Sequence, residues 1–402
     1  MSQPFEAIHV TDRVYWVGAI DWAIRDFHGY STDRGTTYNA YLILADKITL
    51  VDTVKAPFIE QLMSRIRSVV DPRDIDIIIS NHSEMDHSGS LPTVIDAVKP
   101  SRIVASKMGV KALAQHFGRS DVDEVSDGES LSLGDANVTF YETRMLHWPD
   151  SMFTYLHEDE LLFSQDAFGM HLASCEMLTD ELDKSVLDWE AAKYYANILM
   201  PYSPIVTKLL DRLDELALPL KVVAPDHGPM WRSDIDRIIE KYRVWAEMRP
   251  NLKVVIVYDT MWGSTAMMAH SIADGVRSAG GCPRVLPLGS ADRSQVAAEV
   301  LEAGALLVGT PTINNQMFPR LADTLSYLKG LKPRNLIGTA FGSHGWSGEG
   351  ALHVHEILGD MGVELLTDAK GILTSQYVPD DDALRRCHEL GEDVARRLGA
   401  GA

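Results

Sequence analysis

Cysteine is scarce in this chain, and the few that occur are far apart. Only three are present among 402 residues, Cys175, Cys282 and Cys387. No CxxC pair exists, which excludes a disulfide framework and an iron site built from four thiolates. We therefore expect three buried or surface thiols in a reducing compartment, and a cytoplasmic protein.

Positive charge and long apolar runs are also in short supply. The chain has 37 basic and 57 acidic residues, which gives a net charge of −20. Such a surface repels phosphate backbones and anionic membranes, so neither nucleic acid nor a membrane is an expected partner. No apolar stretch is long enough to cross a bilayer, and the first residues lack the pattern of a signal peptide. Apolar content of 46% still provides for a sizeable core, and the length predicts two or three domains.

The chain after Pro250 alternates strand-like and helix-like segments. Apolar runs such as "KVVIVYD" are typical of buried parallel strands, and stretches such as "TAMMAHSIADGVRSAG" are typical of the helices that cover them. Five strands and five helices are predicted in this way, with the last strand at "VELL". Residues 251–402 are therefore predicted to form a doubly wound parallel sheet of the flavodoxin-like kind.

Residues 1–250 mix strands and helices less regularly. Strands are expected at "YNAYLILA", "KITLVDT", "NVTFYET" and "LLFSQDAF", and helices at "FIEQLMSRIRSVV" and "LPTVIDAV". This mixture in one long domain predicts a layered α/β sandwich.

Candidate metal ligands gather in "NHSEMDHSGS", residues 81–90, directly after the apolar run "DIDIIIS". Alternation along an extended loop is expected to direct His82, Glu84 and Asp86 to one side. Further candidates stand near the ends of later strands, where polar residues serve chemistry more often than packing. The full set is four imidazoles and three carboxylates: His82, Glu84, Asp86, His87, His147, Asp166 and His227.

The order of these residues resembles the metallo-β-lactamase superfamily across the whole first half. That family has an αββα sandwich with two metals at its strand ends, and its hydrolases read HxHxDH where this chain reads HxExDH. Glu84 thus replaces a histidine with a harder, anionic ligand that stabilises a metal in the +3 state, which favours iron over zinc. The sequence therefore predicts a two-iron site, with Asp166 as the bridging ligand.

A phosphate-binding loop is predicted at "YDTMWGSTAMM", between the first strand and first helix of the second half. Hydroxyl groups and the free N–H groups of a helix N-terminus suit one phosphate there, and Gly263 allows a tight turn. The patterns GxxxxGK[ST] and GxGxxG are both absent, which argues against ATP-type and dinucleotide-type loops. A single phosphate without magnesium favours FMN.

Two further loops, residues 309–319 and 341–350, follow neighbouring strands and define a crevice with the first loop. The three-loop pattern resembles flavodoxin, in which the second and third loops flank the flavin ring. This resemblance implies FMN contacts from residues of all three loops: Thr260, Met261, Trp262, Gly263, Ser264, Thr265, Thr310, Pro311, Thr312, Ile313, Asn314, Asn315, Ser343, His344, Gly345, Trp346, Ser347 and Gly348.

A lactamase-like diiron domain followed by a flavodoxin-like domain resembles the flavodiiron proteins over essentially the full chain. The likeness includes "HGY", "RMLHWPDSM", "YYANI" and "GSHGWSGE". By position, it implies that one iron is bound by His82, Glu84 and His147, and the other by Asp86, His87 and His227. In some members the residue matching His87 is turned off the metal. His28, His171 and Tyr195 are candidates to donate protons or to shape the pocket.

The resemblance implies reduction of dioxygen to water, of nitric oxide to nitrous oxide, or both. Two ferrous ions and one fully reduced FMN hold four electrons, as dioxygen needs, whereas a pair of nitric oxide molecules needs two. The expected electron donor is a separate rubredoxin-like protein, since no fused rubredoxin domain is expected. The expected assembly is a head-to-tail homodimer or a dimer of dimers.

Two alternatives remain open. A metallohydrolase with an attached flavin module would act on an ester or thioester through a metal-bound hydroxide. Glu84 counts against this alternative, and zinc with esterase activity would support it. An electron-transfer or sensing protein would use the metal domain only as a scaffold. The complete ligand set counts against that reading, and an empty metal site would support it.

Overall fold

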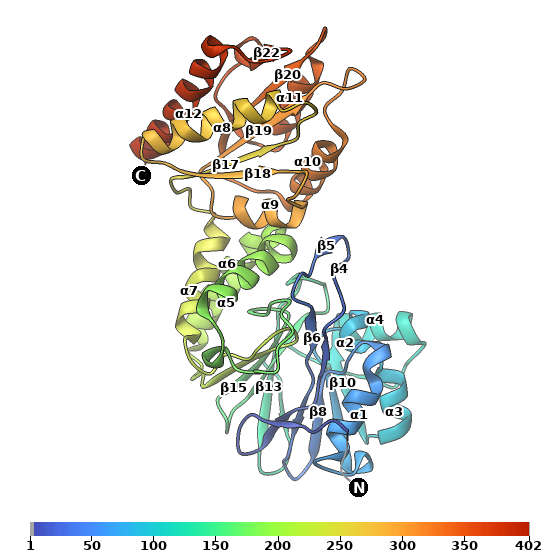
Figure 1. Cartoon of the computed structure of the whole chain (residues 1–402). Coiled ribbons are helices and arrows are strands. Elements are labelled where there is room, and N and C mark those ends of the chain that lie inside the picture. Colours follow the sequence, from blue (N-terminus) through green and yellow to red (C-terminus); the bar gives the residue numbers. More distant parts are fainter. Residues whose placement is uncertain (1–3, 402) are drawn as a thin grey trace. The chain divides into compact units, whose positions relative to one another are not determined.

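Buried strands and amphipathic helices organise the chain into two units in the computed structural model, which describes residues 4–401 (Figure 1). The first unit contains the chain up to Tyr194 together with Pro204–Arg243. The second contains Tyr195–Ser203 and the chain from Val244 onward. The division into a diiron domain of residues 1–250 and an FMN-binding domain of residues 251–402 stays a prediction.

Two sheets face each other in the first unit. The larger has the strand order β1 (Ile8–His9), β2 (Val14–Trp16), β7 (Tyr41–Ile43), β8 (Ile48–Val51), β9 (Ile75–Ser80), β10 (Arg102–Ser106) and β11 (Asp123–Val125). The smaller has the order β12 (Ser130–Ser132), β13 (Asn137–Glu142), β14 (Met152–Leu156), β15 (Leu161–Gln165) and β16 (Val222–Pro225). Trp16, Ile79, Phe140 and Phe163 belong to one buried cluster made by both sheets, and burial of this apolar surface holds the sheets together.

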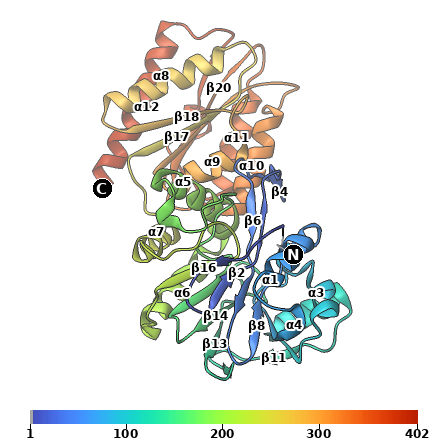
Figure 2. The same cartoon turned by 60° about the horizontal axis from the view of Figure 1, so that its bottom comes forward.

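Helices cover the outer face of each sheet in the first unit. Figures 1 and 2 show one group beside the larger sheet, namely α1 (Ile59–Arg67), α3 (Leu91–Val98) and α4 (Lys107–Phe117). The other group lies beside the smaller sheet and comprises α5 (Lys184–Tyr194), α6 (Ser203–Leu216) and α7 (Ile235–Glu247). The predicted αββα sandwich is confirmed. Two small hairpin-like sheets, β3 (Ala19–Asp21) with β6 (Thr36–Tyr38) and β4 (Asp26–Phe27) with β5 (Tyr30–Ser31), add to its edge.

A parallel sheet forms the centre of the second unit. Its strand order is β18 (Cys282–Pro287), β17 (Lys253–Tyr258), β19 (Ala305–Pro311), β20 (Ile337–His344) and β21 (Glu364–Leu365). Figures 1 and 2 show α8 (Ser264–Ser278) and α12 (Asp381–Gly401) on one face, and α9 (Arg293–Val300), α10 (Pro319–Leu331) and α11 (Glu349–Asp360) on the other. This order, 2-1-3-4-5 along the chain, is that of a flavodoxin-like doubly wound sheet, as predicted.

Two short strands, β21 and β22 (Leu373–Gln376), both pair with the outer side of β20, whereas the sequence pattern predicted only one strand there. β21 pairs with Ile337 and Gly338 at the start of β20, and β22 pairs with Phe341–His344 at its end. The segment "LTSQ" was missed because it is short and mostly polar. β22 carries the following residues to the carboxyl edge of the sheet.

The length and polarity of the helices show whether any of them could cross a membrane. α12 is amphipathic along its 21 residues. Among residues 4–401, no helix combines the length and the apolar character that crossing a bilayer demands.

Candidate metal centre and flavin site

The seven predicted metal ligands converge at the carboxyl ends of strands from both sheets. His82 and Glu84 follow β9, Asp166 directly follows β15, and His227 stands two residues after the end of β16. Asp86 and His87 lie in α2 (Met85–Ser88), a single helical turn, and His147 lies in the turn after β13. The seven form two groups, His82, Glu84, His147 and Asp166, then Asp86, His87 and His227, and within each group the candidate ligand atoms lie within 4.8 Å of one another.

The first group surrounds one point with two imidazoles and two carboxylates. Glu84 Oε2 lies 3.3 Å from His82 Nε2 and 3.2 Å from His147 Nε2. Asp166 Oδ2 lies 3.4 Å and 2.9 Å from the same two nitrogens. Ligands each about 2.1 Å from one ion are about 3.0–3.4 Å apart, so this spacing suits a shared metal.

The second group is completed by the other oxygen of Asp166. Asp86 Oδ2 lies 3.3 Å from His87 Nε2 and 3.2 Å from His227 Nε2. Asp166 Oδ1 lies 3.3 Å and 3.6 Å from these nitrogens. Asp166 therefore presents one oxygen to each group, which is the geometry of a carboxylate that bridges two ions.

The expectation for Asp86 was wrong in one respect. Alternation along an extended loop would direct it to the same side as His82 and Glu84. The chain instead turns into α2 at Met85, because Glu84 has an extended conformation (φ −59°, ψ 147°) and the helical turn follows it. Asp86 consequently lies with His87 and His227 in the second group, which is the grouping that the family resemblance implied.

The donor atoms of this cluster fit metal ions. Both carboxylate oxygens of Asp86, both ring nitrogens of His87 and Oδ1 of Asp166 are buried without a hydrogen-bond partner among the described residues. Buried polar atoms left in this way are costly, and buried carboxylates require a cation. Nitrogen and oxygen donors without thiolate, enriched in carboxylate, favour iron in this site.

The charges within the cluster also fit bound metal ions. Burial acts to raise the pKa of Asp166, but the neighbouring His87, His147 and His82 hold it well below its usual range. Burial acts to lower the pKa of His87, and Asp86 and Asp166 nevertheless raise it to about 10. Asp166 is thus charged, and protons on His82 and His87 offset its charge. Metal ions would displace these protons.

A cavity of about 580 Å³ lies at the carboxyl edge of the sheet in the second unit. Residues from all three predicted loops line it: Met261, Trp262, Ser264, Pro311, Thr312, Asn314, Asn315, Ser343, His344, Gly345, Trp346 and Ser347. Tyr377 and Val378, which follow β22, complete the lining and were not predicted.

The loop at the start of α8 suits a phosphate. Gly263 caps this helix with φ 90°, a left-handed conformation that favours glycine. Its own N–H donates to Thr260 Oγ1 at 3.1 Å, and as a glycine it has no side chain that could bond to the N–H groups of α8. The first N–H groups of α8 are thus available to an anion, beside Ser264 in the cavity lining. These features fit FMN.

Comparison with known proteins gives the same two parts. Residues 36–228 match the family described as "ODP family beta lactamase", and residues 256–390 match "Flavodoxin". The chain is 46% identical to "Nitric oxide reductase" of Moorella thermoacetica, over 99% of this chain and 100% of that protein. It is 41% identical to the solved rubredoxin oxygen:oxidoreductase of Desulfovibrio gigas (TM-score 0.95, 98% and 99% covered). It is 34% identical to the solved flavodiiron protein of Giardia intestinalis (TM-score 0.94, 98% and 97% covered).

The chain belongs to the flavodiiron family. The predicted family is confirmed, and with it an oxidoreductase that has FMN and a diiron site as its cofactors. The assignment of individual residues to these cofactors stays a prediction, supported by the distances above.

Six of the predicted flavin contacts do not line the cavity of this flavodiiron protein: Thr260, Gly263, Thr265, Thr310, Ile313 and Gly348. Thr265 is buried, with its Oγ1 2.9 Å from Ser343 Oγ. Thr310 is buried too, and its hydroxyl donates to Pro311 O and accepts from Phe318 N. These two hydroxyls hold the loops in place.

Groups behind the metal ligands orient the imidazole rings. Asp150 Oδ2 lies 3.2 Å from His82 Nδ1 and accepts from Ser83 N at 2.6 Å. His227 Nδ1 lies 2.6 Å from Thr37 O and donates to it. Such partners fix the tautomer, so that Nε2 faces the metal. Asp150 was missed, although it stands only three residues after His147.

Two of the three predicted neighbours of the site lie beside the cluster. His28 Nε2 is 3.2 Å from Glu84 Oε1, and the His28 side chain is 70% exposed. His171 is buried, and its ring centroid lies 4.6 Å from that of His227. Its Nδ1 and Nε2 meet Thr36 Oγ1 at 2.8 Å and Tyr30 OH at 2.6 Å. Burial lowers the pKa of His171 well below its usual range, so the ring is neutral.

Tyr194, rather than the predicted Tyr195, packs against these histidines. Its ring centroid lies 4.9 Å from that of His171 and 6.0 Å from that of His227. Tyr195 instead presents its hydroxyl to Ser203 Oγ at 3.0 Å and its ring to Trp245. The sequence shows both tyrosines in succession, and α5 ends between them in a π-helical turn that changes the direction of the second.

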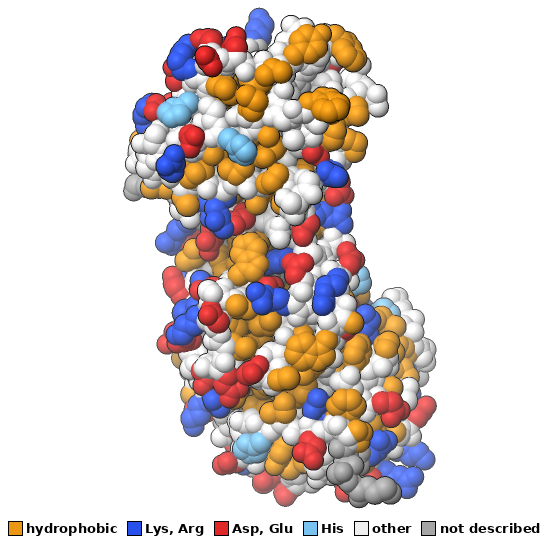
Figure 3. All heavy atoms as spheres, viewed as in Figure 1, with side chains coloured by type: hydrophobic (Ala, Val, Ile, Leu, Met, Phe, Trp, Pro, Cys, Tyr) orange, Lys and Arg blue, Asp and Glu red, His pale blue; other side chains and the backbone are white. Residues whose placement is uncertain are grey.

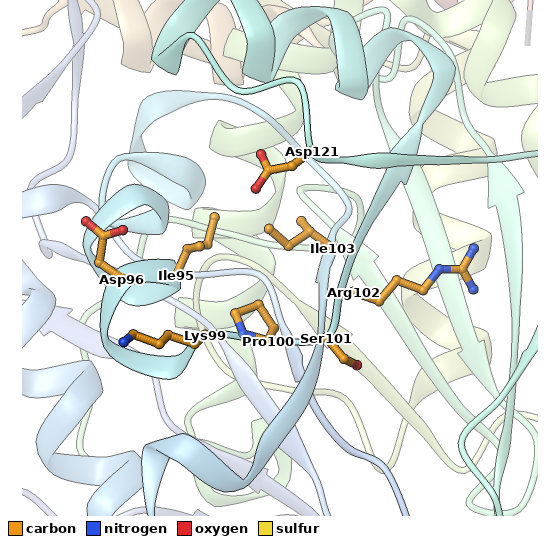
Figure 4. Close-up of a pocket in the computed structure, with 8 residues that line it drawn as sticks. All are labelled: Ile95, Asp96, Lys99, Pro100, Ser101, Arg102, Ile103 and Asp121. Atoms are coloured by element: carbon orange, nitrogen blue, oxygen red, sulfur yellow. The ribbon is translucent and has the colours of Figure 1, made fainter.

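A second cavity, of about 330 Å³, lies beside α3 and β10. Its lining consists of Ile95, Asp96, Lys99, Pro100, Ser101, Arg102, Ile103 and Asp121. In Figure 4 the Arg102 side chain points away from the other labelled side chains, and its Nε donates to Asp123 at 2.7 Å. None of the predicted metal or flavin residues lines this cavity, so we assign it no part in the reaction.

Proposed function

We propose that this flavodiiron protein reduces dioxygen to water at the seven-residue cluster, with FMN as the entry point for electrons. The observation that carries the proposal is the position of Glu84, whose Oε2 lies 3.3 Å and 3.2 Å from His82 Nε2 and His147 Nε2. A carboxylate in place of an imidazole favours a metal that changes between the +2 and +3 states.

The irons supply one-electron chemistry next to the substrate, and the protein residues supply geometry and charge. We assign His82, Glu84 and His147 to one iron, Asp86, His87 and His227 to the other, and Asp166 to both. With both irons ferrous and FMN fully reduced, the protein would hold the four electrons needed to convert O2 and four protons into two water molecules. His28, exposed and 3.2 Å from Glu84 Oε1, is placed to hold a proton at its Nε2.

Nitric oxide is the second candidate substrate. The specific observation in its favour is the relative from Moorella thermoacetica, which is 46% identical and carries the name "Nitric oxide reductase". Conversion of two NO molecules and two protons into N2O and water takes two electrons, which the same cluster can provide.

The electron donor and the assembly are proposed from the family. The name of the Desulfovibrio gigas enzyme includes rubredoxin, which supports a rubredoxin-type donor here. A head-to-tail homodimer, or a dimer of such dimers, would set the FMN of one copy against the cluster of another. The metallohydrolase and the scaffold alternatives lose support, because the chain belongs to an oxidoreductase family and its ligand set is complete.

The test is anaerobic reduction of the purified protein followed by mixing with either gas. We expect rapid repeated flavin reoxidation by dioxygen, about four electrons consumed per O2 and no hydrogen peroxide. Faster turnover with nitric oxide, with N2O as product, would make that gas the substrate. Reoxidation by neither gas, together with esterase activity and bound zinc, would contradict the proposal and restore the hydrolase.

A further inference from the structure

Two residues of the flavin cavity come from outside the three loops that flavodoxin-like sheets present. Tyr377 and Val378 line the cavity and are 64% and 68% exposed. Met261, Trp262 and Trp346, from the loops, are exposed apolar residues of the same lining. In Figure 3 hydrophobic side chains gather at the edge of the unit that carries β20 and β22. Exposed apolar surface concentrated in a cavity is typical of a ligand site.

Tyr377 is fixed in place by the end of the sheet. Its N–H donates to His344 O at 2.7 Å, which extends the pairing of β20 with β22 by one bond. The adjacent Gln376 Nε2 donates to Gly345 O at 2.8 Å. The position of Tyr377 is thus tied to His344 and Gly345, which line the same cavity.

The backbone of Tyr377 is in an unfavourable conformation. Its φ is 58°, in the left-handed region that bulky residues seldom adopt. Asparagine and glycine adopt this conformation with little strain. An exposed tyrosine contributes little to the core. An aromatic residue held in a strained conformation at a cavity wall is more typical of a binding role than of a folding role.

We propose that Tyr377 and Val378 form a further wall of the FMN site and contact the isoalloxazine ring. The inference rests on FMN binding by the flavodoxin-like unit. No lysine, arginine, aspartate or glutamate lines the cavity, so the ring is held by apolar contacts and neutral polar groups. An electron-rich aromatic ring against the flavin disfavours the negatively charged, fully reduced form. Tyr377 therefore lowers the potential at which FMN takes its second electron.

The deciding variant is Tyr377→Asn, because asparagine suits a positive φ and lacks the aromatic ring. We expect the apoprotein to unfold at an unchanged or higher temperature, while the Kd for FMN rises about tenfold, as loss of an aromatic contact predicts. The midpoint potential of the second reduction step should rise. Tyr377→Phe keeps the ring and should leave the Kd within about twofold of the unaltered protein.

The measurements are titration of full-length apoprotein with FMN, followed by flavin fluorescence, and a redox titration of the holoprotein. The matched control is Leu252→Ala, an exposed apolar residue before β17, at the opposite end of the strands, which should change neither value. An unchanged Kd in Tyr377→Asn would overturn the inference, and so would a lower unfolding temperature of its apoprotein. If the unaltered apoprotein bound no FMN, the flavin premise itself would fail.

Discussion

The metal centre and the flavin cavity both lie at the carboxyl ends of strands, but they differ in how their residues meet solvent. His82, Asp166 and His227 are almost completely buried, and their donor atoms point at one another. Trp262 and Trp346 in the flavin cavity are 90% and 87% exposed, and their side chains are apolar.

This difference shows what each site lacks without its cofactor. Buried carboxylates and imidazoles without a metal ion leave hydrogen-bonding capacity unused, so metal binding is coupled to the stability of the first unit. Exposed apolar side chains without a ligand cost far less locally, because they only remain in contact with water. Changes in the cluster should therefore affect metal content and leave FMN content unaltered.

The largest effect is expected for Asp166→Asn. One oxygen of Asp166 faces each group, and an amide supplies only one oxygen and no charge. Turnover with dioxygen should fall by about 1,000-fold, since a bridging ligand should cost more than the 10- to 100-fold typical of groups behind the ligands. Elemental analysis should find fewer than two irons per chain, with FMN unchanged. Asp214→Asn, a 66% exposed surface residue, is the control. Two retained irons and normal turnover would show that Asp166 is no bridge.

Asp150→Asn should have an intermediate effect on one group only. Asp150 touches His82 through Nδ1 and does not belong to either group of ligands. Loss of its charge should weaken metal binding at the first group by about 10- to 100-fold, while the second group stays filled. Metal titration of the apoprotein would resolve the two steps. Asp123→Asn, at a surface ion pair, should leave both unchanged, and equal weakening of both steps in Asp150→Asn would argue against separate groups.

Metal affinity should rise with pH. In the metal-free cluster the carboxylates of Asp86 and Asp166 raise the pKa of His87 to about 10, so this imidazole is protonated at pH 7. A metal ion must displace that proton, which makes the apparent affinity rise about tenfold per pH unit from pH 7 to 9 for each proton released. Calorimetry with Fe²⁺ under anaerobic conditions, in buffers of different ionisation enthalpy, counts the protons. Absence of proton release would mean that the histidines are already neutral.

Glu84→His should change the identity of the bound metal more than the total amount of metal bound. The variant restores the HxHxDH pattern of the hydrolases and removes one carboxylate from the first group. We expect the iron-to-zinc ratio of the purified protein to fall several-fold, with FMN content as the internal control. Glu84→Asp keeps the carboxylate and should hold the ratio closer to that of the unaltered protein. An unchanged ratio in Glu84→His would remove Glu84 as the reason for iron.

Sequence reasoning was most successful where one local rule decides the outcome. The central strands β17 and β19 of the second unit are nearly continuous apolar runs, and buried parallel strands require such runs. The seven candidate ligands are recognisable because they stand near strand ends in a specific order. The fold class and the family followed from these features together with the resemblance.

The remainder depended on short turns that interrupt a regular pattern and on contacts between distant segments. Asp86 lies in a helical turn that begins at Met85, where alternation predicted an extended loop, and Tyr194 took the place of Tyr195 because a π-helical turn follows α5. β22 is polar and gains its place only by pairing with β20. Tyr377 reaches the flavin cavity through that pairing, so no local pattern could have indicated it.

The most direct test of the central claim, that one carboxylate joins two iron sites, is anomalous X-ray scattering at the iron absorption edge from crystals of the iron-loaded protein. The account predicts two iron peaks, one among His82, Glu84 and His147 and one among Asp86, His87 and His227, with an oxygen of Asp166 directed at each. A single peak, or two peaks at the zinc edge and none at the iron edge, would contradict it.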